Sequence, residues 1–528
     1  MSHQQHPTEP RFRLDQRSAG LLVHPTSLAA GPGQPELGSG DLGASARALV
    51  DFAAASGLGW WQMLPVGPVG PGFSPYSSTS VFAGEPMLVS LDALVDDGLL
   101  ERGDPALAPV EPARRVDFVA VRDRRQGALR RAFEKARAGL EHDAEYASFL
   151  EKERYWLDDY AAFATLKELH GGKPYFQWPE AHKKRAPEAM DALRRDHAEA
   201  LAFHRFVQHR FARDLRRLRA YAHERGVGLM GDVPIYVAHD SADVWAHGRF
   251  FQLDAEGDPA FVAGVPPDAF SDDGQLWGNP LYDWAELERT DFGFWVARLA
   301  HAFRCFDSVR LDHFIGFSRY YAVARGEKSA KHGSFHPVPG YALFEAVFRS
   351  LGPVALVAED LGVVTDEVRK LRDHFRLPGM NILQFSFSPG RHNEGSRPHR
   401  YAQRSVVYTG THDNDTTAGW LGSPPDDASE AGRAAWLSDR DYCLRYLGLD
   451  ADKPAGELAW GVVRAALASH ADTAFVPAQD LLGLGREARM NRPGIAEGNW
   501  SVRLLPGELD TKLAVRVREL TELYGRAP

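Results

Sequence analysis

The chain has 528 residues, of which 44% are hydrophobic and 25% charged, with a formal net charge of -10. The acidic balance argues against a general nucleic-acid partner, and no run of 18 apolar residues is present to cross a membrane. The two cysteines, Cys305 and Cys443, exclude a disulfide framework and a cysteine-based zinc site. We expect both to be ordinary buried thiols in a reducing cytoplasm.

The N-terminal stretch "MSHQQHPTEPRFRLDQR" is polar and lacks the apolar centre of a signal peptide. We expect residues 1–18 to form a flexible tail, because nothing in them can bury surface. Residues 19–528 are then the folded part. This length exceeds the ~250–300 residues at which a single core stops growing, which predicts several domains or one large fold with insertions.

Eight short apolar runs predict strands, because each ends in polar or charged residues followed by Gly, Pro or Asn. They lie at 20–28, 60–68, 228–236, 308–316, 354–362, 381–390, 405–415 and 473–483. Helical periodicity occurs between them at 42–59, 204–226 and 366–375. This alternation predicts an α/β fold of the (β/α)8 TIM-barrel type. A doubly wound open sheet fits less well, because no glycine-rich phosphate loop follows the first strand.

A barrel needs only ~250 residues, so the remaining length belongs to insertions. The connection after the second strand is charged and helical in pattern, which predicts a mainly helical insertion at about 85–200. The connection after the third strand is rich in Gly, Pro, Asp and aromatic residues. It predicts an irregular insertion at about 238–300, placed around the C-terminal mouth of the barrel.

Charged residues gather where the predicted strands end. They are Asp232, Arg310, Asp312, His313, Glu359, Asp360, His412, Asp413 and Asp415. The C-terminal ends of barrel strands meet at one mouth, and unpaired buried carboxylates are costly, so such a gathering suggests use. Any one of them could instead cap a helix, and Arg310 with Asp312 could be a structural ion pair.

Converging carboxylates are compatible with two chemistries. One is a divalent metal site that uses His412 with the acids. The other is glycosyl transfer, which needs a nucleophile and a proton donor. Tyr76 and Trp277 lie in Gly/Pro-rich loops. They favour a sugar, because the C–H faces of sugar rings stack on aromatic surfaces, although either side chain could simply be a packing residue.

Several long segments resemble a known family. They are "SPYSSTSVFAGEP", "GDVPIYVAHDSADVWA", "GVPPDAFSDDGQLWGNPLY", "SVRLDHFIGF", "AEDLG", "LPGMNILQF", "TGTHDNDTT" and "PAQDLLGLGREARMNRPG". In order from about Leu21 to Trp500 they resemble the 4-alpha-glucanotransferases (amylomaltases or disproportionating enzymes) of glycoside hydrolase family 77. The resemblance implies a barrel with inserted subdomains and no separate C-terminal β-domain. One departure is "DHFIGF", in which Ile315 replaces an Arg found in many members; this puts a local charge contact in question.

The resemblance implies a retaining transferase. It would move 4-alpha-glucan segments from a maltooligosaccharide, amylose, starch or glycogen to the 4-hydroxyl of glucose or another glucan, through a covalent glycosyl-aspartate. The implied nucleophile is Asp312, the acid/base Glu359, and the transition-state-stabilising residue Asp413. The implied sugar contacts are Ser74, Tyr76, Asp232, Asp268, Gln275, Trp277, Arg310, His412 and Asn491.

From the residues we expect Arg310 to favour the ionised form of Asp312, and nearby carboxylates to raise the pKa of Glu359. No cofactor, metal, nucleic acid or membrane is expected, and the chain should be a cytoplasmic monomer or weak oligomer. Three alternatives remain: a plain α-glucan hydrolase, a catalytically silent glucan-binding protein and a metal-dependent barrel hydrolase.

Overall fold

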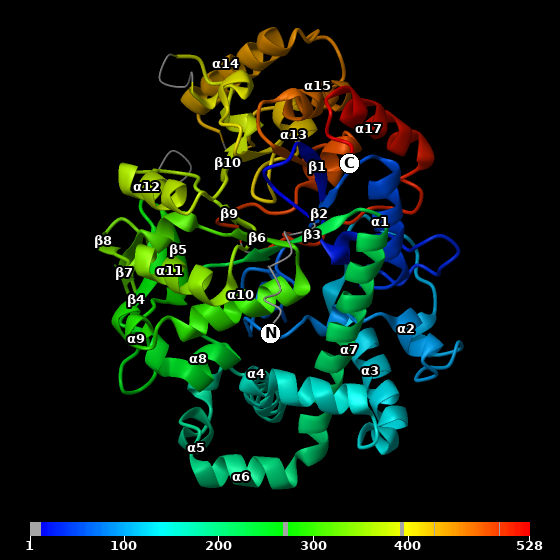
Figure 1. Cartoon of the computed structure of the whole chain (residues 1–528), viewed down its shortest axis with the longest axis vertical. Coiled ribbons are helices and arrows are strands. Elements are labelled where there is room, and N and C mark those ends of the chain that lie inside the picture. Colours follow the sequence, from blue (N-terminus) through cyan, green and yellow to red (C-terminus); the bar gives the residue numbers. More distant parts are fainter. Residues whose placement is uncertain (1–11, 268–272, 391–394, 427, 496) are drawn as a thin grey trace, which may run out of the picture.

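A closed barrel of eight parallel strands forms the centre of the computed structural model, which describes residues 12–267, 273–390, 395–426, 428–495 and 497–528 (Figure 1). The strands are β1 (Ser18–Leu22), β2 (Trp60–Gln62), β3 (Gly228–Val233), β6 (Ser308–Leu311), β9 (Leu356–Ala358), β10 (Gly379–Ile382), β11 (Ser405–Tyr408) and β12 (Thr473–Pro477). Neighbouring strands follow chain order, and β12 closes the barrel on β1. Each of the eight predicted runs overlaps one of these strands. The TIM-barrel prediction is confirmed, and the open sheet is excluded.

Helices between the strands surround the barrel (Figure 1). They include α1 (Ala44–Ala55), α7 (Ala198–Glu224), α10 (Gly293–Cys305), α11 (Gly340–Leu351), α12 (Asp366–His374), α13 (Thr417–Gly422), α14 (Glu430–Leu447), α15 (Ala455–Ala468), α16 (Ala478–Leu481) and α17 (Thr511–Leu523). The three helices predicted from periodicity correspond to α1, α7 and α12. The strands are buried on both faces because these helices cover their outer side.

The barrel interior is layered because strand side chains alternate between inside and outside. An apolar layer fills its lower part, formed by Trp60, Met230, Val357, Met380, Val406 and Phe475. Two residues further along β2, β3, β9 and β11, the side chains are polar: Gln62, Asp232, Glu359 and Tyr408. The barrel interior is therefore apolar at its lower end and polar at its upper end.

The predicted N-terminal tail is shorter than expected within the described residues. Leu14 is buried in the apolar layer at the barrel floor. The ring of Phe12 lies 5.7 Å from that of Trp60 and 4.9 Å from that of His223. The boundary at residue 18 was therefore wrong for residues 12–17, because two apolar side chains in a polar stretch close the lower end of the barrel. Residues 1–11 lie outside the described part.

The connection between β2 and β3 is helical. It contains α2 (Leu91–Asp96), α3 (Phe118–Leu140), α4 (Ala144–Leu169), α5 (Glu180–Lys183), α6 (Pro187–Asp196) and the first half of α7. Asp117 and Asp143 cap α3 and α4, each accepting a backbone N–H at 3.0 Å. Helix α4 packs along α7, and α7 continues into the barrel layer, so one long helix fixes this insertion to the barrel (Figure 1).

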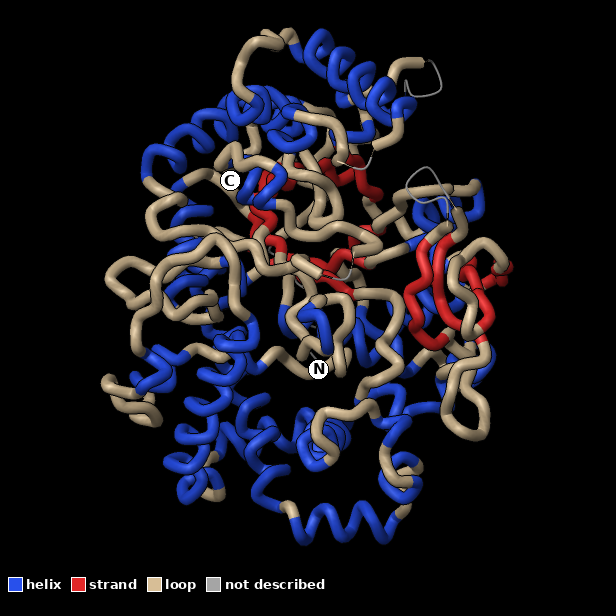
Figure 2. The backbone as a smooth tube through the Cα atoms, turned by 180° about the vertical axis from the view of Figure 1, so that it is seen from behind, coloured by secondary structure: helices blue, strands red, loops and turns tan. Residues whose placement is uncertain are grey.

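The connection between β3 and β6 is less irregular than expected. It contains α8 (Ala242–His247), β4 (Phe261–Val265), β5 (Gln275–Pro280), α9 (Trp284–Arg289) and α10. β4 and β5 form an antiparallel sheet with β7 (Arg319–Ala324) and β8 (Gly333–Pro337), seen beside the barrel in Figure 2. The predicted insertion at about 238–300 thus contains regular elements, and half of the sheet that it helps to form comes from the chain after β6.

After β12 the described residues form helices and loops and no further strand, as expected for a chain without a separate C-terminal β-domain. Among the helices that the structure describes, none is long and apolar enough to span a membrane.

Candidate active site

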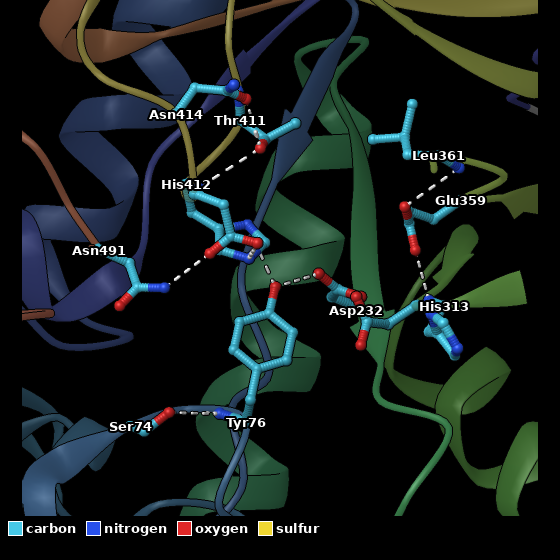
Figure 3. A network of polar contacts seen from close by, with 12 residues as sticks. Ser74, Tyr76, Asp232, His313, Glu359, Leu361, Thr411, His412, Asn414 and Asn491 are labelled. Carbon is cyan, nitrogen blue, oxygen red and sulfur yellow. Dashed lines mark hydrogen bonds and ion pairs between the residues drawn. The ribbon is translucent and has the colours of Figure 1, made fainter. Parts of the chain in front are cut away.

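Polar side chains converge at the C-terminal mouth of the barrel (Figure 3). They come from the ends of β3, β6, β9 and β11 and from the loops that carry Tyr76 and Asn491. Strand β5 contributes Gln275 and Trp277 from the side. Asp268, predicted as a sugar contact, lies outside the described residues.

Arg310 forms the positive centre of the mouth. Its Nη1 donates to both carboxylate oxygens of Asp232 at 2.8 Å and lies 3.0 Å from Oδ1 of Asp312. Burial acts to lower the pKa of Arg310, but Asp232 and Asp312 outweigh it and raise the pKa well above its usual value. The guanidinium is therefore charged. Asp232 is its fully buried partner, whereas the Asp312 side chain is 25% exposed and faces the mouth.

Glu359 is a buried carboxyl whose hydrogen-bond partners are backbone N–H groups. Its Oε2 accepts the backbone N–H of His313 at 2.6 Å, and its Oε1 accepts that of Leu361 at 3.3 Å. Burial, assisted by Asp312 and Asp360, raises the pKa of Glu359 well above its usual value against the effect of Arg310. The expected direction is confirmed. Burial is the largest cause, however, and the neighbouring carboxylates are secondary.

His313 turns the chain at the end of β6. Its backbone is left-handed, with φ of 48°, which aims its N–H at Glu359. Burial lowers the pKa of the imidazole to about 4, so the ring is neutral near pH 7. The ring lies edge-on to Trp277, with centroids 4.9 Å apart. Sequence reasoning gave His313 no role, although its place between Asp312 and the Gly316 turn was a usable signal.

Asp413 lies on the far side of the mouth and is about half exposed. Its Oδ1 accepts the Asn491 amide at 2.6 Å, and its Oδ2 is 3.3 Å from Nε2 of His412. Partial desolvation acts to raise the pKa of Asp413, but His412, Asn491 and Arg310 outweigh it and lower the pKa well below its usual range. Asp413 is therefore ionised at all ordinary pH values.

Tyr76 links the two sides of the mouth (Figure 3). Its hydroxyl donates to Asp232 Oδ2 at 2.7 Å, and its ring stacks on His412 with centroids 4.7 Å apart. Ser74 Oγ accepts the Tyr76 backbone N–H at 3.3 Å and so shapes this loop. The ring of Trp500, which sequence reasoning missed, lies 5.7 Å from Tyr76 and 5.8 Å from His412.

Strand β5 brings aromatic surface toward the end of β6. Trp277 Nε1 donates to Gln275 Oε1 at 3.2 Å, and the indole lies 5.9 Å from the Tyr236 ring. Together with the His313 contact, this places Trp277 and Gln275 near the end of β6, which carries Asp312. Eight of the nine predicted sugar contacts are described, and all eight lie around the mouth or on the strand that borders it.

Two strand-end carboxylates belong to the fold instead. Asp360 accepts the Met380 N–H at 2.8 Å and pairs with Arg372, while Asp415 pairs with Arg486 at 2.6 Å. The Ile315 side chain is only 7% exposed and packs in the hydrophobic core. At the position where many family members were expected to have an Arg, this chain therefore has an apolar packing contact.

Two further side-chain expectations can be compared with the described residues. Cys443 is buried as expected, but Cys305 is only half-buried. Within those residues, no group of three or more His, Cys, Asp or Glu is arranged to hold a metal ion.

Comparison with known proteins agrees with this geometry. The model of the 4-alpha-glucanotransferase family matches residues 23–508. The chain is 44% identical to the 4-alpha-glucanotransferase of Thermus thermophilus, over 97% of this chain and 99% of that protein. It is 42% identical to the Synechocystis enzyme, over 97% and 99%. The structure of the Streptococcus agalactiae amylomaltase in complex with acarbose superposes with a TM-score of 0.89 at 32% identity, over 97% and 100% of the chains. The chain thus belongs to the 4-alpha-glucanotransferase family.

Proposed function

We propose that this protein moves 4-alpha-glucan segments between 1,4-alpha-glucans with retention of configuration, through a covalent glycosyl ester on Asp312. The observation that carries the proposal is the different surroundings of two carboxyls at adjacent strand ends. Asp312 stands 3.0 Å from the Arg310 guanidinium, and the pKa of Glu359 is raised. A nucleophile must be ionised and a general acid must be protonated, and this arrangement supplies one of each.

In the first step, an Asp312 oxygen attacks the anomeric carbon while Glu359 gives its proton to the leaving glycosidic oxygen. The bond from carbon to the leaving oxygen breaks and an ester to Asp312 forms. In the second step, the 4-hydroxyl of an acceptor glucan or glucose attacks the same carbon, its proton goes to Glu359, and the ester is released. Two inversions give net retention, for which the two carboxyl groups should lie ~5–5.5 Å apart in the substrate complex.

Asp413 is assigned to the sugar at the cleavage point. It is ionised, half exposed, and oriented by Asn491 and His412. A carboxylate held in this way can accept hydroxyl hydrogen bonds that strengthen as the ring flattens in the transition state. The remaining contacts, Ser74, Tyr76, Asp232, Gln275, Trp277 and Arg310, are assigned to the same glucan, and Asp268 is retained as a proposed contact from sequence.

Transfer rather than hydrolysis requires that a sugar reaches the ester before water does. The four-stranded sheet and the Tyr76 loop both border the mouth and offer the rings of Trp277 and Tyr76 as flat surfaces. These surfaces can hold an acceptor ring in line with Asp312. A plain hydrolase would use the same carboxylates and is the second candidate.

Maltotriose supplied alone separates the two candidates. A transferase should give glucose and a ladder of longer 4-linked chains, with the number of reducing ends nearly constant. A hydrolase should raise the number of reducing ends steadily and give no product longer than maltotriose, which would overturn the proposal. Proton NMR should show that the newly formed 1,4-linkages have the α configuration, because inversion would give β-linkages.

We also propose a cytoplasmic location and a monomeric or weakly associating chain. The two cysteines are free thiols, which suits a reducing compartment. Cell fractionation with a compartment marker and analytical ultracentrifugation test these two points. A stable oligomer at micromolar concentration would contradict the second.

A further inference from the structure

The helical insertion encloses a cavity that the proposed chemistry does not use. Its volume is about 190 Å³, and it lies between α3, α4, α7 and the segments that flank the Tyr76 loop. A cavity of about 150 Å³ holds a benzene ring in other proteins, so a six-membered ring fits this one. None of the three candidate catalytic carboxylates lines it.

Polar groups in the cavity wall are held rigidly. The Gln208 amide donates to the Gly84 carbonyl at 2.9 Å and accepts the Gly84 N–H at 2.7 Å. The Tyr160 hydroxyl interacts with the same amide. Glu85 is 5% exposed and accepts the N–H groups of Val69 at 2.8 Å and Met87 at 3.0 Å. The wall thus presents a hydroxyl, an amide and a carboxyl in fixed positions, which is how small ligands are oriented.

Two nitrogens in the cavity wall are buried without a hydrogen-bond partner in the part of the chain that the structure describes. They are Nε2 of His204 and Nε of Arg125. Burial lowers the pKa of His204 to about 3, so its ring is neutral near pH 7. Nε2 lies 3.5 Å from a Glu168 oxygen, beyond a normal hydrogen bond to it. Unpaired buried polar atoms are costly, so a small side-chain shift that brought either nitrogen against a ligand hydroxyl would be favourable.

The charged groups that line the cavity already have partners. Glu168 pairs with Arg130 at 2.8 Å, and Arg125 pairs with the buried Asp41 at 3.1 Å. Arg122 lies over the Phe73 ring at 4.5 Å. The rest of the wall is apolar, with Leu129, Phe203, Val207 and Pro86 among its members. This mixture suits a neutral ring with polar edges and apolar faces, and it disfavours a phosphate or a carboxylate.

We propose that this cavity binds one neutral pyranose unit, either free glucose or the end of a glucan chain. The choice of glucose among hexoses rests on the proposed function, while the cavity itself specifies only a neutral hydroxylated ring. The site is connected to the mouth, because Arg122 donates to the Val69 carbonyl at 3.2 Å and stacks on Phe73 in the Tyr76 loop. A bound sugar would therefore contact the segment that positions Tyr76.

Glucose titration followed by calorimetry tests the proposal in a Trp277→Ala background, in which sugar binding at the mouth is weakened. Glucose should still bind to this protein. Adding Leu129→Trp, which fills the cavity, should raise the glucose Kd at least ~10-fold, the equivalent of about 1.4 kcal/mol. Tyr160→Phe should raise it ~5-fold through the loss of one buried hydrogen bond.

Two controls keep the test decisive. Because Leu129 is buried, circular dichroism must show that the Leu129→Trp variant keeps the native fold. If that variant is misfolded, Gln126→Trp, at the exposed rim of the cavity, is used in its place. Maltohexaose titrations with and without the filling substitution distinguish the sources. A site for a chain end predicts that filling the cavity weakens the binding of both sugars, and a free-hexose site predicts that it weakens the binding of glucose alone. Equal glucose affinity with and without the filling substitution, or a glucose-soaked crystal with only water in the cavity, would overturn the proposal. Either result leaves the maltotriose test of transfer unaffected.

Discussion

Two carboxylates lie close together in sequence at the end of β9, and two more lie close together after β11. In each pair, the two side chains have different surroundings. Glu359 and Asp413 face the mouth, whereas Asp360 and Asp415 face the surrounding structure. The outward carboxylates are paired with Arg372 and Arg486. The inward ones have no such arginine pairing among the described ion pairs and contact backbone N–H groups, an amide or a histidine instead. A strand end can thus carry one carboxylate that faces the mouth and one that is paired with an arginine in the surrounding structure, depending on which side of the barrel wall each occupies.

The largest expected effect compares the proposed nucleophile, Asp312, with Asp360, a carboxylate paired in the surrounding structure. Asp312→Ala should lower kcat by at least ~10⁴-fold, because covalent catalysis is lost. Asp360→Ala should leave kcat within about threefold but lower the free energy of unfolding by about 2 kcal/mol, because Arg372 and the Met380 N–H lose their partner. Maltotriose turnover and urea unfolding measure the two effects. Similar kcat losses in both variants would contradict the assignment of Asp312 to the reaction and Asp360 to the fold.

Glu359→Gln should reduce turnover by at least ~10²-fold, the usual size of a general-acid effect. Binding of an unreactive glucan should change little, because the amide keeps the shape of the side chain. The control is Asp360→Asn, which should retain turnover. Near wild-type activity in Glu359→Gln would make the acid/base assignment wrong.

The raised pKa of Glu359 also predicts two pH effects. Activity should fall as pH rises through that pKa, because the general acid loses its proton. The stability contribution of the protonated carboxyl is fully present below the unfolded value of 4.5 and is lost as pH rises through the folded pKa. Wild type should therefore lose stability relative to Glu359→Gln as pH rises above 4.5. Parallel stability curves for the two proteins would show that the pKa is not raised.

A smaller effect is expected at the exposed side of the mouth. Asn491→Ala removes the 2.6 Å hydrogen bond to Asp413. Since Asp413 is about half exposed, water replaces part of this interaction, and kcat/KM should fall only ~3–10-fold. Asn491→Asp is the sharper comparison, because a second negative charge beside Asp413 should cost more. Equal losses in the two variants would point to a role in loop shape alone.

The smallest effect concerns Ile315. Because the side chain is buried in the core, Ile315→Val should lower the free energy of unfolding by about 1 kcal/mol and leave the product distribution from maltotriose unchanged. Thermal unfolding and chromatography of the products measure both. A shift in acceptor preference without loss of stability would instead place Ile315 in contact with substrate.

The sequence by itself determined the barrel, because a parallel strand covered on both faces requires a local apolar run and each strand leaves that run in its own segment. It also placed Asp312, Glu359 and Asp413 at strand ends, where barrel geometry brings them to one mouth. The antiparallel sheet was decided only by tertiary structure, because β4 and β5 must pair with β7 and β8 from beyond β6. So were the seating of Leu14 at the barrel floor and the edge-on contact of Trp277 with His313. The proton states also needed the fold, since burial, which outweighs the neighbouring charges in raising the pKa of Glu359, is a property of the assembled wall and not of any segment.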